Sequence, residues 1–299
     1  MSAPQPGIFA LGNAAHAYLE LDLVAGADAR RLVEVLATLQ ASQATGGGVN
    51  LVVGFRPEIW RAIAPSGLPA DLSGFTRPVH GIEGFSMPAT QHDAVLWLAG
   101  GAYEIVFDAI VAALRLLEGI ARVADETAGW SYRHNRDLTG FEDGTENPKL
   151  AEAPQAALVP AAQAGSGGSV LLLQKWRHLA EQWNALPDAE QEKVIGRTKR
   201  DSVELDPRPE SSHAKRTDQD DFGDIFRRNM AYGTASDHGT MFVGFCASQK
   251  PLADMLDSMA GLTNGVRDAL TRFSTPLTGA YYWVPSVEAL GVFAKADAG

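Results

Sequence analysis

Hydrophobic and polar positions along the first half of the chain follow the periods of strands and helices in turn. The segment HAYLELDLV (16–24) alternates as a half-buried strand does, and DARRLVEVLATLQASQ (28–43) then places Leu32, Leu36 and Leu39 on one helical face. GGGVNLVVGF (46–55) is a short β-rich run after a glycine break. HDAVLWLAG, AYEIVFDAIVAALRLLEG and ARVADETAGWSY follow as strand, helix and strand. The pattern predicts β-α-β followed by β-α-β.

The second half repeats this plan. GSVLLLQKWRHL, GTMFVGFCAS and TGAYYWVPS are predicted strands, with helices over PDAEQEKVIGRTK and PLADMLDSMAGL. We therefore expect an α+β protein of two ferredoxin-like βαββαβ units, with antiparallel sheets packed together. The units are predicted at 1–150 and 151–299, and the Ala, Pro and Gly-rich stretch 151–169 has the composition of a linker between them.

Composition narrows the classes of function. The chain has 299 residues, of which 45% are hydrophobic and 20% charged, as in a globular protein. A net charge of −11 argues against nucleic-acid binding, because neutralising phosphates requires clustered Lys and Arg. No apolar run is long enough to span a bilayer and the N-terminus lacks a signal-peptide pattern, so we expect a cytoplasmic protein with no membrane partner.

The cysteine count restricts the possible metal chemistry. The single cysteine, Cys246, excludes an internal disulfide, a CxxC metal site and a CxxCH covalent haem attachment. It lies in a predicted buried strand and is interpreted as a core residue. A metal would have to be held by His, by carboxylates or by a cofactor.

The motif GFEDGTENP (140–148) concentrates three carboxylates and two glycines. An EF-hand loop is a poor match, because Pro148 stands where the loop needs Gly and Pro154 stands where it needs Glu. A phosphate-binding loop is also unsupported, since there is no GxxxxGK[ST]. Taken alone, the motif is equally compatible with a solvated turn.

Two later segments change the interpretation. His213 lies in the polar loop DPRPESSHAKR, and DIFRRNMAYG places Arg227, Arg228 and Asn229 at the start of a strand. Read separately, a loop histidine and an arginine pair are surface residues. Together, GFEDGTENP, SSHAKR, FRRNMAYGTASDHGTMFVGF and RDALTRFSTPLTGAYYWVPS resemble the dye-decolorising peroxidases, and among them the compact bacterial B-type. The resemblance covers nearly the whole chain.

This resemblance implies a haem peroxidase that reduces hydrogen peroxide and oxidises dyes and other aromatic one-electron donors through a ferryl intermediate. It implies one non-covalent haem b per chain, with its iron, bound mainly by the second unit. His213 matches the proximal iron ligand. Asp143, Arg227 and Asn229 match the distal catalytic residues, and Phe242 matches a distal-pocket phenylalanine. The residues expected to contact the cofactor are His213, Asp143, Gly144, Thr145, Glu146, Arg227, Phe242 and Asp268.

Some alternatives remain open at this stage. Asp268 is either the carboxylate partner of His213 or an acid on a helix surface. Arg228 should point away from Arg227 if the segment is extended. A haem- or porphyrin-handling protein with slow peroxidase turnover is the alternative function, and a domain pair without haem is a third.

The expected partners are hydrogen peroxide and aromatic donors. Donors too large for a buried pocket leave surface electron relays open among the six Trp and six Tyr. The resemblance also implies a homo-oligomer. The chain ends soon after the last predicted element, at GVFAKADAG, so no tail for an encapsulin shell is expected.

Overall fold

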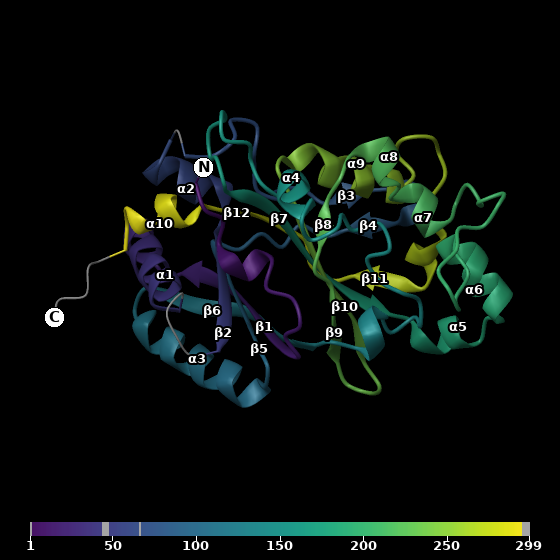
Figure 1. The fold of residues 1–299 in the computed structure, drawn as a ribbon, viewed down its shortest axis with the longest axis horizontal. Helices are drawn as coiled ribbons and strands as arrows, with labels where there is room; N and C mark the ends of the chain where they lie inside the picture. The colour runs from purple at the N-terminus through teal and green to yellow at the C-terminus, as the bar shows by residue number, and fades with distance from the viewer. Residues whose placement is uncertain (1, 44–47, 66, 295–299) are drawn as a thin grey trace.

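A closed antiparallel sheet organises the fold. The computed structural model describes residues 2–43, 48–65 and 67–294. Within these ranges ten strands form one sheet in the order β11-β7-β12-β2-β5-β1-β6-β9-β10-β8, and a further pairing of β7 with β10 closes it (Figure 1). The strands are β1 (Ala15–Leu23), β2 (Val49–Phe55), β5 (Ala94–Gly100), β6 (Ala121–Trp130), β7 (Ser169–His178), β8 (Phe226–Arg227), β9 (Met230–Gly233), β10 (His238–Cys246), β11 (Ser274–Pro276) and β12 (Ala280–Val284). A separate pair joins β3 (Val79–His80) and β4 (Ser86–Met87).

The α+β class and the antiparallel pairing agree with the sequence-based expectation. In the first half the order is β2-β5-β1-β6, and in the second half β12-β7-β10-β9, so the first and third long strands of each half are central neighbours. The structure differs in how the halves meet. They share one sheet, because β12 pairs with β2 at Trp283 and Phe55, and β6 pairs with β9 at Gly129 and Tyr232. Edge strands carry unpaired backbone groups, and joining the edges satisfies them.

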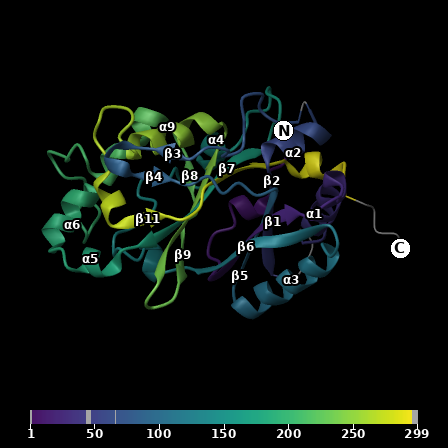
Figure 2. The ribbon, with the colours of Figure 1, turned by 180° about the vertical axis from the view of Figure 1, so that it is seen from behind.

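Helices cover the outside of this barrel in two groups. The helices α1, α2, α3 and α10 lie on one side, and α5 to α9 lie on the other (Figure 1 and Figure 2). The helices are α1 (Ala29–Gln43), α2 (Pro57–Ile63), α3 (Tyr103–Leu116), α4 (Ala153–Ala157), α5 (Ala180–Asn184), α6 (Asp188–Ile195), α7 (His213–Arg216), α8 (Gln219–Phe222), α9 (Gln249–Met259) and α10 (Val287–Gly291).

Side-chain alternation divides the core into two parts. Residues that point into the barrel form one cluster, which includes Tyr18, Trp97, Leu171, Val243 and Tyr282. The opposite faces of the same strands pack beneath the helices in a larger cluster. In β10 the predicted alternation is confirmed, since Met241, Val243 and Phe245 belong to the inner cluster while Thr240 and Phe242 line a cavity outside.

The stretch expected to be a linker is packed into the fold. Ala153 and Ala157 of α4 are fully buried, and the carbonyl of Ala156 accepts a hydrogen bond from the backbone of Ala247. Small side chains let this segment lie close to β10. Its alanine-rich composition therefore reflects close packing and not a linker. The expectation that the chain has no encapsulin tail concerns its C-terminal end. Residues 295–299 of that end lie outside the described residues. Within the described part of the chain, no helix is both long and apolar enough to cross a membrane.

Candidate active site

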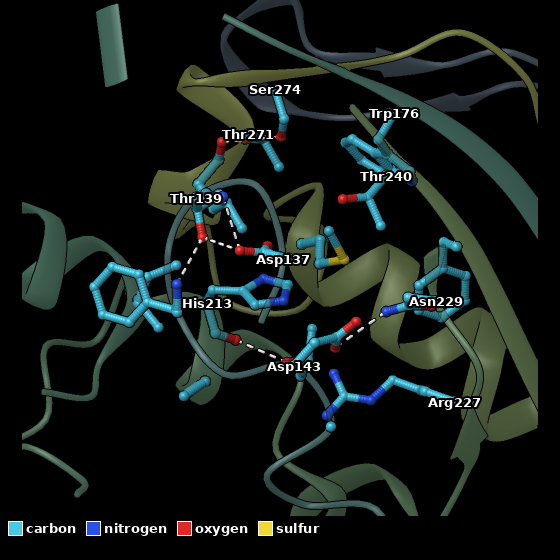
Figure 3. A pocket seen from close by; sticks show the side chains of 18 of the residues that line it. Asp137, Thr139, Asp143, Trp176, His213, Arg227, Asn229, Thr240, Thr271 and Ser274 are labelled. Atoms are coloured by element: carbon cyan, nitrogen blue, oxygen red, sulfur yellow. Dashed lines mark hydrogen bonds between the residues drawn. The ribbon is translucent and has the colours of Figure 1, made fainter. Parts of the chain in front are cut away.

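The motif Gly140–Pro148 forms a loop that is held by hydrogen bonds to its backbone atoms. The N–H of Asp143 donates to the carbonyl of Asn135 over 2.7 Å, and the Arg136 guanidinium donates to the carbonyl of Gly140 over 2.8 Å. Gly144 has a φ of 77°, and a Cβ there would lie 2.9 Å from Nδ2 of Asn147. Glycine is therefore required by the backbone conformation and by its neighbour within the loop. The carboxylate of Asp143 faces the cavity (Figure 3).

Asn147 fixes this loop to the strand that carries Arg227. Its Nδ2 donates to the carbonyl of Arg227 over 2.8 Å, and its Oδ1 accepts from the N–H of Arg227 over 2.9 Å. The two residues are 80 positions apart in the sequence. Asn147 thereby sets the distance between the acidic loop and the arginine.

Arg227 and Asn229 face the same cavity as Asp143 (Figure 3). Nδ2 of Asn229 donates to the Asp143 carboxylate over 3.2 Å, and its Oδ1 accepts from the N–H of Val243 over 3.0 Å. The Nε of Arg227 is buried and has no hydrogen-bond partner among the described residues. Because an unpaired buried donor is costly, this guanidinium is suited to an anionic or polar ligand.

Arg228 points elsewhere, as alternation along an extended segment predicts. Its guanidinium donates to the carbonyls of Ile8 and Ala10, over 2.7 Å in both cases. It also lies 5.2 Å from the ring of Trp97. Arg228 therefore ties the N-terminal segment to the barrel and does not line the cavity that contains His213.

His213 lies at the start of α7, with its ring in the cavity. Its Nδ1 is 2.7 Å from Oδ2 of Asp268, and the other oxygen of Asp268 accepts from the N–H of Leu270 over 2.8 Å. Asp268 is fully buried, so the helix-surface alternative is wrong. Burial by itself lowers the pKa of His213, but the Asp268 carboxylate outweighs it and the pKa is raised. With Nδ1 donating to Asp268, Nε2 is the nitrogen available to a ligand.

Four more of the predicted contact residues line this cavity, whereas Asp268 bonds to His213 and does not line it. Gly144, Thr145, Glu146 and Phe242 are all on its wall. Glu146 is engaged by Arg197, whose Nη2 is 2.6 Å from its carboxylate. Apolar side chains from α9 and the late loop complete the wall, among them Leu252, Met255, Met259, Leu270 and Phe273. The structure thus brings together residues that lie more than one hundred positions apart in the chain.

One acidic residue of the cavity was missed by the sequence analysis. Asp137 accepts from the N–H of Thr139 over 2.8 Å and also from its hydroxyl. Burial, followed by the neighbouring charge of Asp143, raises the pKa of Asp137 to about 6. It lies near His213 and Asp143 (Figure 3). Nothing in the segment RDLTGF distinguishes Asp137 from an ordinary turn residue, so only the folded chain identifies it.

A second cavity of about 580 Å³ adjoins the first on the side of Asp143. Asp143, Arg227 and Asn229 line both. Its outer wall includes Tyr132 and Arg133, which follow the end of β6. The three polar residues therefore stand between the cavity that contains His213 and a second opening.

Known proteins share this fold and these segments. A family model described as Dyp-type peroxidase, C-terminal, matches residues 134–289. A dye-decolorizing peroxidase of Rhodococcus erythropolis is 32% identical over 303 residues, which cover 96% of this chain and 88% of the relative. The solved structure of DyPB from Rhodococcus jostii has a TM-score of 0.87 at 33% identity and covers 96% of this chain and 97% of its own. A variant of that protein, solved in complex with heme, has a TM-score of 0.87 at 32% identity, with 96% and 98% covered.

The chain belongs to the Dyp-type peroxidase family, and is an oxidoreductase that acts on peroxide. Within that family its structure is close to DypB of Rhodococcus jostii, a B-type member.

Proposed function

We propose that the cavity binds one haem b non-covalently, with His213 as the iron ligand and with Asp143, Arg227 and Asn229 on the opposite face. The unit 1–150 would supply the acidic loop, and the unit 151–299 the iron ligand and most of the wall. One observation carries the proposal. The bond to Asp268 leaves Nε2 of His213 free, and the Asp143 carboxylate and the Arg227 guanidinium line the same cavity. The heme complex of the similar DypB variant supports it.

The donor set fits a haem and does not fit a bare metal ion. Among the described residues, no group of three or more His, Cys, Asp or Glu side chains is arranged to hold a metal. A single histidine suffices when a porphyrin provides the other ligands. The apolar wall from Leu252 to Met259 suits a flat hydrophobic ring, and the unpaired Nε of Arg227 is available to a polar ligand.

Bound haem would supply the iron at which hydrogen peroxide is reduced by two electrons. Asp143 would accept the proton of the nearer peroxide oxygen and return it to the farther oxygen, which leaves as water. Asn229 orients the Asp143 carboxylate through its 3.2 Å bond. Arg227 keeps its charge and would stabilise negative charge as the O–O bond breaks. Phe242, on the same wall, would exclude water.

The second cavity gives peroxide a route to these residues. It reaches Asp143, Arg227 and Asn229 without passing His213. Dyes and other large aromatic donors do not fit such a site and would deliver electrons through the protein. Asp268 would make His213 more basic toward the iron.

Two measurements test the proposal. Purified protein should show a Soret band that the His213→Ala variant loses, and its absence from the wild type would overturn haem binding. In stopped flow, Asp143→Asn and Arg227→Leu should slow the peroxide-dependent change of that band by on the order of 100-fold or more. Glu142→Gln, which removes a charge from the same loop, is the matched control. Equal rates in all variants would refute the distal assignment and favour a haem-handling protein.

A further inference from the structure

A buried tyrosine and a buried carboxylate meet inside the barrel. The hydroxyl of Tyr282 on β12 donates to Oε1 of Glu20 on β1 over 2.6 Å, although the residues are 262 positions apart. Tyr282 is 0% exposed and Glu20 is 1% exposed. Oε2 of Glu20 is buried and has no partner among the described residues. The proposed peroxide chemistry uses neither residue.

Charged groups surround the pair at one end of the barrel. Asp125 and Lys175 form an ion pair of 2.5 Å, and His92 contacts Asp22 at 2.9 Å. The groups that face Glu20 are Tyr282 on β12, Asp125 on β6, Lys175 on β7 and His92 before β5. Asp22 on β1 acts on Tyr282. Burial is the main reason why the pKa of Glu20 is raised to about 7. Burial, followed by the nearby carboxylate, also raises the pKa of Tyr282, so the phenol keeps its proton.

Tyr282 lies on the inner side of the wall that bounds the haem cavity. In the ladder between β12 and β7 it is paired with Leu171. The next residue, Leu172, and Gln174 point outward and line the cavity that contains His213. One strand layer thus separates the phenol from the proposed haem site. An electron can cross such a layer, whereas a donor molecule cannot enter the barrel.

The oxidation of a buried phenol requires a proton acceptor. Removing one electron makes the phenol O–H strongly acidic, and in a low-dielectric interior the proton needs a bonded base to receive it. Glu20 is such a base, already at hydrogen-bond distance. Tyr18, two residues away on β1, is also buried, but its hydroxyl has no hydrogen-bond partner among the described residues.

We propose that Tyr282 is an internal electron donor and that Glu20 takes up its proton. This inference rests on the proposed haem site, which supplies the oxidant. Tyr282 loses one electron to the peroxide-oxidised haem, its O–H bond breaks, and the proton forms a new O–H bond at Oε1 of Glu20. The products are a neutral tyrosyl radical, a protonated Glu20 and a haem reduced by one electron. The pair would hold oxidising equivalents inside the barrel when no external donor is present.

Electron paramagnetic resonance on the haem-loaded protein tests the inference. Samples are frozen after one equivalent of hydrogen peroxide, with no donor present, in protein that contains either ordinary or ring-deuterated tyrosine. We expect a radical signal that deuteration narrows and that Tyr282→Phe loses. Tyr281→Phe is the matched control. Tyr281 is the adjacent residue, is 4% exposed and stacks on Phe75 at 5.3 Å between ring centroids.

Glu20→Gln keeps the size of the side chain and removes the base. We expect its radical yield to fall several-fold, and the wild-type yield to rise between pH 6 and pH 8 while the yield of this variant stays flat. A signal that persists in Tyr282→Phe would overturn the assignment. So would a signal that responds to deuterated tryptophan, which would indicate a tryptophan radical instead.

The change of the Soret band, followed in the same samples, separates the two proposals. A normal peroxide-dependent change without a tyrosyl signal overturns only the role of Tyr282. A wild-type protein that does not respond to peroxide overturns the proposed function, and the role of Tyr282 fails with it because the oxidant is missing.

Discussion

Asn147→Ala should show whether catalysis depends on where Arg227 is held, because this variant keeps the arginine but removes the side chain that positions it. The wild-type amide makes two hydrogen bonds to the backbone of Arg227, at 2.8 and 2.9 Å. The short strand β8 has few other constraints, since its ladder with β10 contains two residue pairs. Without the amide, the acidic loop and β8 lose their direct connection. The guanidinium can then move relative to the Asp143 carboxylate.

The expected cost follows from the two lost bonds. Each hydrogen bond contributes on the order of 1 kcal/mol to stability. The backbone N–H and carbonyl of Arg227 would also stay partly shielded from water without a partner, which adds to the loss. We therefore expect a loss of about 2 to 3 kcal/mol in the free energy of unfolding, measured by urea titration. A displacement of about 1 Å at a catalytic group can cost on the order of 100-fold in rate. The rate of the peroxide-dependent Soret change in stopped flow should fall by up to that amount, with haem content preserved.

Gln5→Ala is the matched control for this prediction. Gln5 binds the backbone of Val53 in the same two-bond manner, at 2.8 and 2.9 Å, and also donates to the carbonyl of Pro285. It is fully buried, and it does not line the cavity. Its loss should destabilise the protein at least as much and leave the peroxide rate unchanged. An equal loss of rate in both variants, or none in Asn147→Ala, would refute the positioning role.

Three further predictions concern single side chains. Because the pKa of Glu20 is raised from 4.5 to about 7, the folded chain holds an extra proton between these pH values, and its stability falls as pH rises through them. From pH 5 to pH 8, the stability of Glu20→Gln, followed through its Tm, should therefore gain about 2.5 kcal/mol relative to wild type, and parallel Tm profiles would contradict this. Asp268→Ala should cost about 3 kcal/mol and lower haem retention on gel filtration, because His213 loses a buried partner; unchanged retention would argue against the pairing. Gly144→Ala should cost about 1 to 2 kcal/mol in urea, since alanine resists a φ of 77°, and no loss would mean that the loop adapts.

Local patterns along the chain were sufficient for the elements and for part of the site. The alternation in GTMFVGFC correctly divided β10 into a face in the barrel and a face on the cavity, because a strand sends successive side chains to opposite sides. The same alternation sends the side chains of Arg227 and Arg228 to different sides. Asp143, His213 and Arg227 were identified by segments that resemble a family, and the structure places all three on one cavity.

Only the tertiary structure decided how these pieces combine. The periodicity of hydrophobic residues specifies which face of a strand is buried, but it does not specify which strands pair at their edges. The closure of one sheet through β7 and β10 could therefore not be predicted from the sequence. The burial of Asp268 behind His213 and the raised pKa of Asp137 depend on residues distant in the chain. The same is true of Glu20, a polar position in an alternating strand that becomes a buried base only when β12 brings Tyr282 to it. The sequence by itself determined the local elements and the chemical groups; long-range packing determined their partners, because burial and charge act through space.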